Sequence, residues 1–546
     1  MIWSSAFRRS EGRAAAVVRH GSQAASCKAS DHILSMQQRR IILIYPPVAR
    51  ACEAPAGIAR LGGALKQRGA AYALVDANYE ALADLLASPG TDGDTWTRRS
   101  RRHLKAHLET LCGSGGFDNM DRYRRAVFDL NRLLYVAGRP KGVHLGLANY
   151  QDERLSPLRS RDLLEAAGSP ERNPFFGYFS RRLRQLMRDD RPSWVGFSLV
   201  YLSQALTTFA MAGYLRRIRP DVRILLGGGL VTSWMRSPAW RGPFGDLFDV
   251  MVSGAGEAAL LDILELPPGG RRSLPDYDDL RSNAYLSPGF ILPYSASDGC
   301  YWNRCSFCPE RAEQNPYRPL PAATAVDDLH RLAAQTKPVL IHLLDNALSP
   351  KLMAALAANP PGPPWYGFAR ITPHLADPDF CRSLKRSGCR MLQLGLESGD
   401  QRVLDSLCKG IDLQTAVAAL EALGQAGIAT YVYLLFGTAA ENRGAAQKTL
   451  DFTVAHKDGI GFLNLAVFNL PAYGPEVRVL DTSRFYEGDL CLYRNFDHPQ
   501  GWQRQRVRRF LDRDFKRHPA VAPIIRRDPP IFTSNHAAFF TGLKGP

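Results

Sequence analysis

The sequence predicts an α/β protein in which a doubly wound (Rossmann-like) domain precedes a partial (β/α)6 TIM-like barrel and a basic C-terminal extension. Two observations predict this fold class. Strand-sized apolar runs alternate with helical segments along most of the chain. A stretch rich in Pro, Gly and Asp at 266–290 separates two such series, as a linker does. With 546 residues, 45% of them hydrophobic and 22% charged, the chain is long enough for more than one globular domain.

The first series of elements lies within residues 40–265. A strand at 41–45 runs into a Pro-Pro pair, and a helix and a second strand at 73–75 follow it. Residues 80–190 are polar, arginine-rich and mostly helical in pattern, so we interpret them as an insertion. The alternation of strands and helices resumes at 194–199, and this order is typical of a doubly wound sheet.

The second series, within residues 291–484, contains six strand–helix repeats. Its strands are expected near 292–297, 338–344, 365–371, 389–395, 428–436 and 460–468. Six parallel strands joined by crossover helices form a partial barrel, with active residues at the C-terminal ends of the strands. Residues 485–546 are expected to form a basic C-terminal extension that is helical at first.

The ends and the charge of the chain carry less information. Residues 1–39 lack periodicity, so we expect a transit peptide, a disordered tail or an upstream start-codon error, with Met36 as the favoured start. The net charge of +17 is diffuse, and arginine is concentrated in this tail, at 98–105 and at 504–516. Because no aromatic residues are interleaved with these arginines, we expect a solvated surface and not a nucleic-acid site.

Composition also bears on where the protein works. No stretch reaches the roughly 20 apolar residues that a membrane helix needs, so we expect no membrane association. Ten cysteines are too few for a disulfide scaffold in a chain of this size, and no secretory signal opens the sequence. These observations indicate a reducing cytoplasm, where clustered cysteines usually bind metal.

The strongest functional signal is a group of three cysteines directly after the first barrel strand. Cys300, Cys305 and Cys308 have the spacing C-x4-C-x2-C. A cubane iron–sulfur cluster needs one ligand per iron, so three thiolates leave one iron open for a substrate to chelate. A structural zinc site needs four ligands, and the nearest histidines, His330 and His342, form no closely spaced pair. We therefore expect a [4Fe-4S] cluster and keep zinc as the alternative.

With this motif the sequence resembles the radical S-adenosylmethionine (SAM) superfamily, specifically the branch with an N-terminal cobalamin (vitamin B12)-binding-type domain. The most specific part of the resemblance is the run Gly299-Cys-Tyr-Trp-Asn-Arg-Cys-Ser-Phe-Cys308. The commonest spacing in the superfamily is C-x3-C-x2-C, and we associate the extra residue in the first gap with cobalamin-type members. The resemblance implies that the open iron chelates SAM and that reductive cleavage of SAM yields a 5′-deoxyadenosyl radical.

The resemblance also implies roles for residues at other strand ends. Asp345 is expected to end the second barrel strand and to meet the methionine amino group of SAM. Arg370 is expected to pair with its carboxylate, which suits a planar guanidinium. Glu397, in the segment Gly395-Leu-Glu-Ser-Gly399, is expected to accept hydrogen bonds from the ribose. Glu441 is a weaker candidate for a functional residue, because the proline that the family usually has two residues earlier is replaced by Ala439.

The first domain carries part of a cobalamin signature. Ser198 ends a strand, and Gly227 and Gly228 follow a later strand, which resembles the Ser-x-(Leu/Val)…Gly-Gly pair of cobalamin-binding domains. In the family these glycines let the dimethylbenzimidazole tail lie against the backbone. The companion Asp-x-His-x-x-Gly motif is absent, since the loop at Asp76 has no histidine. Either cobalamin binds without a protein ligand to cobalt, or the domain keeps the fold without the corrinoid.

We therefore predict a radical SAM enzyme with a [4Fe-4S] cluster and SAM as cofactors, and with cobalamin as a further candidate cofactor. The leading reaction is cobalamin-dependent methyl transfer to an unknown substrate, with an electron donor such as flavodoxin or ferredoxin as partner. One alternative is hydrogen abstraction by the 5′-deoxyadenosyl radical with a cobalamin-free N-terminal domain. A second, from another class, is a non-catalytic zinc or iron–sulfur protein that binds nucleic acid.

Overall fold

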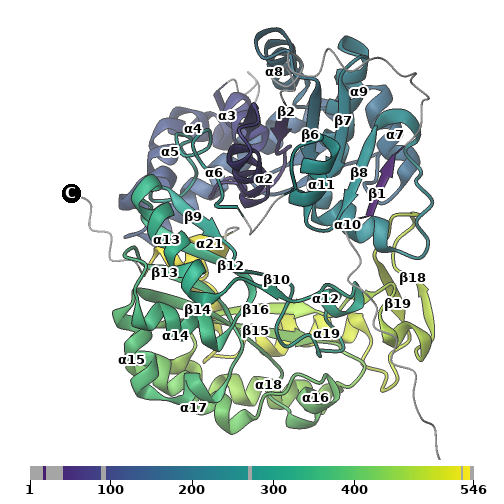
Figure 1. Ribbon diagram of the computed structural model, residues 1–546. Coiled ribbons are helices and arrows are strands. Elements are labelled where there is room, and N and C mark those ends of the chain that lie inside the picture. The colour runs from purple at the N-terminus through teal and green to yellow at the C-terminus, as the bar shows by residue number, and fades with distance from the viewer. Residues whose placement is uncertain (1–15, 20–40, 88–93, 269–272, 531–532, 541–546) are drawn as a thin grey trace, which may run out of the picture.

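The computed structural model describes residues 16–19, 41–87, 94–268, 273–530 and 533–540, and contains two parallel sheets that follow one another along the chain (Figure 1). The first sheet has the order β1-β8-β7-β6-β2-β3. Its strands are β1 (Ala16–Arg19), β2 (Ile41–Ile44), β3 (Tyr72–Val75), β6 (Trp194–Ser198), β7 (Arg223–Gly227) and β8 (Val250–Ser253). All neighbours are parallel except β1, which pairs antiparallel with β8.

The strand order of this sheet locates a ligand crevice. The first of the parallel strands along the chain is β2, in the centre of the sheet; β3 lies on one side of it, and β6, β7 and β8 follow on the other. In doubly wound sheets, ligands bind beyond the carboxyl ends of the strands where the direction of winding reverses, which is here between β2 and β6. The helices around the sheet are α2 (Ala56–Gln67), α3 (Ala77–Ala87), α9 (Leu202–Ile218), α10 (Gly229–Arg236) and α11 (Gly256–Ile263).

The insertion between α3 and β6 is mostly helical, with one short hairpin. Its elements are α4 (Thr95–Arg102), α5 (Leu104–Cys112), α6 (Met120–Gly138), β4 (Val143–Leu145), β5 (Tyr150–Asp152), α7 (Ser160–Gly168) and α8 (Phe176–Asp189). Apolar residues on one side of α6, α7 and α8 join the core on one face of the first sheet. The insertion is therefore an integral layer of this half of the molecule.

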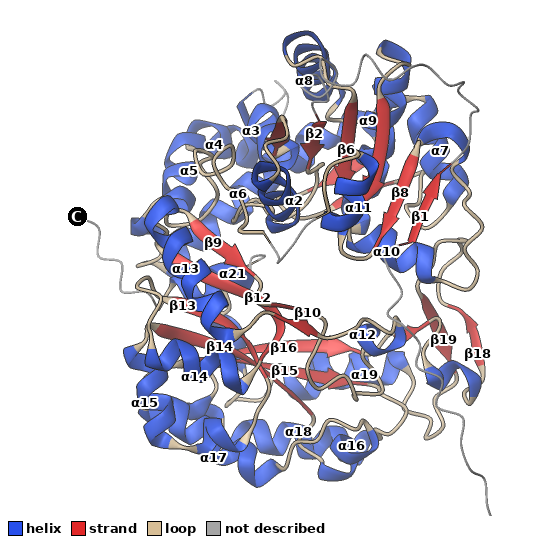
Figure 2. Cartoon of the chain, viewed as in Figure 1, coloured by secondary structure: helices blue, strands red, loops and turns tan. Residues whose placement is uncertain are grey.

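The second sheet is a six-stranded partial barrel with the order β16-β15-β14-β13-β12-β9, all parallel. Its strands are β9 (Ile291–Tyr294), β12 (Leu340–Leu348), β13 (Trp365–Ala369), β14 (Cys389–Glu397), β15 (Ala429–Phe436) and β16 (Phe462–Val467). Its helices are α13 (Ala322–Thr336), α14 (Pro350–Ala358), α15 (Pro378–Arg386), α16 (Gln401–Ser406), α17 (Leu413–Gln425) and α18 (Arg443–Ala455). Figure 2 shows these helices on the outer side of the sheet, with its inner side toward the first half of the molecule.

The remaining elements close the barrel. A short hairpin of β10 (Ser297–Asp298) and β11 (Arg318–Pro319), with α12 (Pro309–Ala312) inside its loop, extends from the end of β9. The C-terminal elements are β17 (Leu470–Pro471), β18 (Thr482–Arg484), β19 (Tyr493–Phe496), α19 (Arg504–Phe510), α20 (Ala522–Arg527) and α21 (Thr533–Ala538). His536 of α21 stacks on Tyr431 with ring centroids 4.6 Å apart and meets Phe462 edge-on, so α21 covers the base of the barrel.

The predicted fold class, a Rossmann-like domain followed by a partial TIM-like barrel, is confirmed, with three local differences. β1 adds a strand within residues 1–39, where we expected a tail, because the outer edge of β8 offers unpaired backbone groups. The C-terminal extension begins with strand β19 and not with a helix. β12 continues three residues beyond Asp345, so this residue lies inside the strand. Within the described ranges, none of the helices is both long and apolar enough to cross a membrane.

Candidate functional site

The three cysteines lie in the loop of the β10–β11 hairpin, at the C-terminal end of β9. Gly299 begins this loop with φ +72°, and a Cβ there would lie 2.5 Å from the carbonyl oxygen of Pro316. Only glycine fits that conformation and that close approach, so the start of the loop is fixed by the sequence. Cys308 directly precedes the first turn of α12.

The thiols lie in a partly enclosed environment beside two cations. Burial raises the pKa of Cys305, and it raises the pKa of Cys308 to about 11. Lys409 and Arg370 act in the opposite direction on the pKa of Cys305, and Nη1 of Arg370 lies 3.9 Å from its Sγ. Thiolates at this place therefore gain from a bound metal and from the neighbouring positive charge.

The donor set of three sulfurs in nine residues fits an iron–sulfur cluster with one open iron. In the part of the chain that the structure describes, no group of three His, Cys, Asp or Glu side chains is already placed to hold a metal ion. His330 and His342 are engaged elsewhere, with Pro360 and with Glu53. Neither of these two histidines acts as a fourth zinc ligand here.

A second loop, residues 407–410 after α16, packs against the cysteine loop. The backbone N–H of Ser306 donates to Leu407 O (3.0 Å), and Nε1 of Trp302 donates to Cys408 O (2.9 Å). Trp302 lies in the four-residue gap between the first two cysteines, and the guanidinium of Arg370 stacks on its ring at 4.1 Å. Nη2 of Arg370 donates to Lys409 O. Arg370 is thus held between the two loops, directly after β13, where the sequence predicted it.

Glu397 ends β14 and forms an ion pair with Lys409. The distance from Nζ to Oε1 is 2.7 Å, and both residues are buried, with exposed fractions of 8% for Glu397 and 4% for Lys409. Glu397 has φ +71°, a conformation that is uncommon for residues other than glycine, and this turns its carboxylate toward the second loop. The carboxylate that we expected to meet the ribose therefore already has a cationic partner within the protein.

Asp345 lies beside the segment that leads into the cysteine loop. One carboxylate oxygen accepts from Ala296 N (3.0 Å) and the other from Ser297 Oγ (2.5 Å). Its contacts therefore fasten β10 to β12. The expected contact of Asp345 with the methionine amino group of SAM stays a prediction.

Ser198, Gly227 and Gly228 come together at the C-terminal edge of the first sheet. Ser198 is the last residue of β6 and pairs with Gly227, the last residue of β7. Gly228 has φ +115°, and a Cβ there would lie 2.3 Å from Leu199 O, so the two strand ends approach each other closely. Asp76 lies apart from these residues, at the end of β3, where burial raises its pKa to about 7 and Tyr285 donates a hydrogen bond to it.

The two halves of the molecule are joined at the ligand crevice of the first sheet. Glu53, in the loop that follows β2, accepts a hydrogen bond from Nδ1 of His342 on β12 at 2.9 Å. The His342 ring stacks on Tyr366 of β13, with centroids 4.4 Å apart and an interplanar angle of 12°. Nearby, Arg60 of α2 forms ion pairs with Glu257 and with Asp298, at the start of the cysteine loop.

The inner side of the barrel is more accessible than its outer side. On β12, β13 and β15, the inward-facing His342, Phe368 and Tyr433 are partly exposed, whereas their sequence neighbours are buried beneath the helices. Alternation of this kind follows from the two-residue period of a strand. These three side chains of the inner face therefore remain partly accessible.

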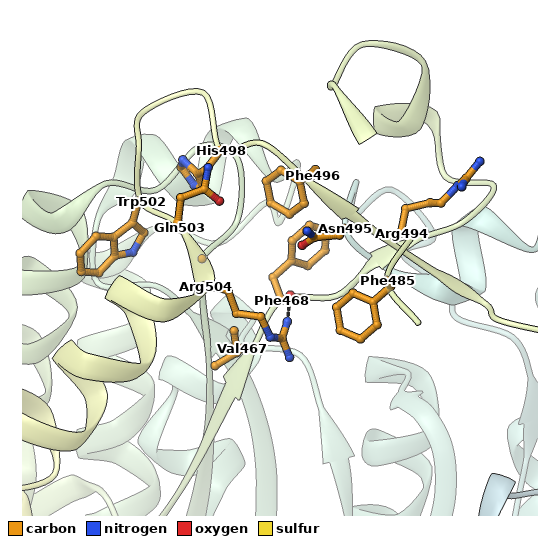
Figure 3. A pocket seen from close by; sticks show the side chains of 11 residues that line it. Val467, Phe468, Phe485, Arg494, Asn495, Phe496, His498, Trp502, Gln503 and Arg504 are labelled. Carbon is orange, nitrogen blue, oxygen red and sulfur yellow. Dashed lines mark hydrogen bonds between the residues drawn. The ribbon is translucent and has the colours of Figure 1, made fainter. Parts of the chain in front are cut away.

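The C-terminal extension covers the end of β15. Oε2 of Glu441 accepts from Gly437 N and from Nε1 of Trp502, and burial raises the pKa of Glu441 to about 7. His498 binds the carbonyl of Thr438 at 2.8 Å. The cavity beside these residues, shown in Figure 3, measures about 20 Å³, which is enough for a water molecule and too small for a substrate.

Sequence reasoning missed Lys409, Trp302 and the Glu53–His342 contact. Trp302 lies within the cysteine motif, and Lys409 follows the Gly395–Gly399 segment along the chain. Nothing in the sequence shows that the turn after α16 folds back over the cysteines. Glu53 and His342 are 289 residues apart, so only the packing of the two halves brings them together.

The comparisons with known proteins agree with this geometry. The sequence model of the Radical SAM superfamily matches residues 294–453. Among proteins with curated descriptions, none matches the chain in sequence. The radical SAM methyltransferase TsrM from Kitasatospora setae, solved with cobalamin and a [4Fe-4S] cluster bound, is 16% identical over 80% of this chain and 77% of that chain, with a TM-score of 0.49. OxsB, a cobalamin-dependent SAM radical enzyme solved with aqua-cobalamin and SAM bound, is 13% identical to this chain. The similarity covers 88% of this chain and 68% of OxsB, with a TM-score of 0.57.

The match to the superfamily runs from the last residue of β9 into α18, and includes the cysteine loop and the second loop beside it. The similarity to OxsB shows that both halves of the molecule share a fold with that enzyme. A [4Fe-4S] cluster and SAM are the cofactors that the family implies. The barrel half of the chain therefore carries a domain of the Radical SAM superfamily, and the chain as a whole shares its fold with the cobalamin-dependent SAM radical enzyme OxsB.

Proposed function

We propose that this chain is a cobalamin-dependent radical SAM methyltransferase. The observation that carries this proposal is the contact between Glu53 and His342, 2.9 Å apart, which sets the ligand crevice of the first sheet against the inner side of the barrel. A ligand held at the end of β2 and β6 and a ligand held inside the barrel would therefore face the same space. Methyl transfer by way of a corrinoid needs this arrangement, because the carrier must meet both SAM and the substrate.

Accessibility supports a shared space of this kind. Tyr201, which follows β6, is 50% exposed, so its ring is accessible at the carboxyl end of the first sheet. Arg50, in the loop after β2, acts on the pKa of Tyr201 and also on that of Tyr433 in the barrel. Both loops at the crevice thus lie close to the barrel interior.

We assign the cofactors to residues as follows. Cys300, Cys305 and Cys308 would hold the cluster, and Ser198, Gly227 and Gly228 would lie against the corrinoid tail. SAM would lie beside Asp345, Arg370 and Glu397, whose charges suit its ammonium, carboxylate and ribose groups in that order. The residue ranges 40–265 and 291–484 are our proposed domains, with 266–290 as the linker.

The cluster supplies an electron for reductive cleavage of SAM, and the corrinoid supplies a carrier for the methyl group. The chain's own residues hold these groups, exclude water and orient the substrate, whose identity is unknown. We propose a small electron donor such as flavodoxin or ferredoxin as partner, no nucleic-acid partner, and a cytoplasmic location, where thiols stay reduced.

The cluster assignment is tested by single Ala variants of the three cysteines. Because each thiolate would be the only protein ligand of one iron, each variant should lose the iron–sulfur absorption spectrum and the consumption of SAM under dithionite. Cys381→Ala, at a buried thiol that donates to Leu375 O, is the matched control and should keep its iron. Retention of a reducible cluster in any of the three variants would contradict the assignment.

The corrinoid assignment is tested by reconstitution with hydroxocobalamin followed by gel filtration. We expect about one corrinoid per chain, and Co(II) electron paramagnetic resonance without nitrogen superhyperfine splitting from an axial protein ligand, since the loop at Asp76 has no histidine. Failure to retain any corrinoid would refute the methyltransferase proposal. The alternative, hydrogen abstraction with a cobalamin-free N-terminal domain, would then lead.

A further inference from the structure

A pocket of about 460 Å³ opens on the insertion, outside the barrel and the ligand crevice. Its walls are helices α4, α5 and α6, which lie side by side in Figure 1, and the turn at residues 114–116. The side chains that define its chemistry are those of Arg99, His103, His107, Arg122 and Arg125. The volume is typical of pockets that hold a small organic ligand.

The acidic side chains at this pocket do not neutralise it. Asp129 is buried, and its carboxylate is already bound by Nε1 of Trp96 (2.6 Å), by His107 (2.9 Å) and, at 3.5 Å, by Arg99. These donors hold the pKa of Asp129 below its usual value, although burial acts in the other direction. Glu109 is largely exposed and lies 3.9 Å from Lys105, in the next turn of α5.

The two arginines of α6 that face the pocket are available for a ligand. Neither the guanidinium of Arg122 nor that of Arg125 has a carboxylate within ion-pair distance among the residues that the structure describes. Arg125 is close enough to lower the pKa of His107. Two guanidinium groups without an anionic partner on one helix face, three residues apart, favour an anion between them.

The turn that closes the pocket also offers space. A Cβ at Gly115 would meet no heavy atom within 4 Å, so the backbone of the turn borders the open volume. Gly116, by contrast, is in contact with Thr110 of α5, which fixes the turn against the pocket wall. Exposed backbone in a glycine-containing turn allows a ligand oxygen to approach closely.

We propose that this pocket binds a phosphate-bearing small molecule of nucleotide size. Phosphate groups carry several negative oxygens, and the planar fork of arginine matches them in pairs. Of the basic residues at 98–105, which the radical SAM site does not use, Arg99 and His103 line this pocket. A carboxylate ligand of single charge would leave one of the two α6 guanidiniums unmatched.

Isothermal titration of the full-length, cluster-containing protein with ADP, pyrophosphate and inorganic phosphate tests this proposal. We expect saturable binding of one equivalent of ADP or pyrophosphate. The variant Arg122→Gln/Arg125→Gln should weaken it about 100-fold, because each hydrogen bond to a charged group accounts for roughly a tenfold change. Arg98→Gln is the matched control, since Arg98 lies on α4 but does not line the pocket.

Iron content and thermal stability of the variants show that the protein still folds, and SAM consumption should remain at the wild-type level. Absence of saturable binding at millimolar ADP and pyrophosphate would overturn the proposal. So would an equal loss in Arg98→Gln, because a diffuse basic surface gives that result. Tight binding of single-stranded RNA that depends on Arg98 as much as on Arg122 would assign the surface to nucleic acid instead.

Discussion

The ion pair between Glu397 and Lys409 allows a quantitative test of how the SAM site is built. Both side chains are at least 90% buried and their charged atoms are 2.7 Å apart. Lys409→Met keeps the length of the side chain but leaves the carboxylate buried without its cation. Breaking a buried pair in this way costs about 3–5 kcal/mol of unfolding free energy.

A double-mutant cycle separates the pair from its surroundings. Glu397→Gln/Lys409→Met removes both charges, so we expect the double variant to cost at least about 2 kcal/mol less than the sum of the single variants. Urea unfolding followed by tryptophan fluorescence measures these differences. Lys516→Met is the control, because its pair with Asp512 is exposed and contributes less than about 1 kcal/mol.

Two results would refute this reasoning. A cost below about 1 kcal/mol for Lys409→Met would mean that the pair behaves like a surface salt bridge. Additive costs would mean that the two charges do not interact. Titration with SAM adds an independent readout: Glu397→Gln should weaken binding roughly ten- to a hundred-fold and leave the cluster spectrum intact, since the carboxylate is our proposed ribose acceptor.

Three further predictions follow from other contacts. Burial raises the pKa of Glu441 to about 7 from 4.5, so the contribution of its protonated form to stability is complete below pH 4.5 and is lost as the pH rises through 7. The free energy of unfolding should change by about 3 kcal/mol over this range. Glu441→Gln should flatten this pH profile in denaturant unfolding between pH 5 and 8. Gly228→Ala should cost about 1–3 kcal/mol and lower corrinoid retention, whereas Gly229→Ala, whose Cβ would meet only Cγ1 of Val200 at 3.9 Å, should be nearly neutral. Glu53→Ala should cost about 1–2 kcal/mol in unfolding free energy, and Glu53→Gln, which keeps an acceptor for His342, should cost less; equal costs would contradict the interdomain hydrogen bond.

The order of elements could be predicted from the sequence because the hydrophobic periodicity of an element and the residues that bound it are local properties. Each barrel strand is an apolar run bounded by Gly, Pro or a helix cap, so its place is visible within about ten residues. β1 was missed because the prediction depended on such local signals. Its four residues have no periodic context of their own, and they form a strand only because β8 offers an edge.

The site was predictable where one motif contains it, and not where two segments meet. Cys300, Cys305 and Cys308 are recognised by spacing, and Arg370 by its place after a strand. The engagement of Asp345 with the backbone of Ala296, and of Glu397 with Lys409, depends on how loops fold back over the barrel. Such contacts are set by tertiary packing, which leaves no periodic trace in the sequence.

The covering of the barrel base by α21 has a consequence for how the enzyme matures. Synthesis proceeds from the N-terminus, so β9 to β16 are complete before Tyr431 and Phe462 acquire their contacts with His536. During that interval the underside of the barrel stays open to solvent. The cysteine loop lies at the opposite end of the strands, so cluster insertion does not have to wait for α21 to dock, and a fusion partner attached after α21 would prolong only the exposure of the base.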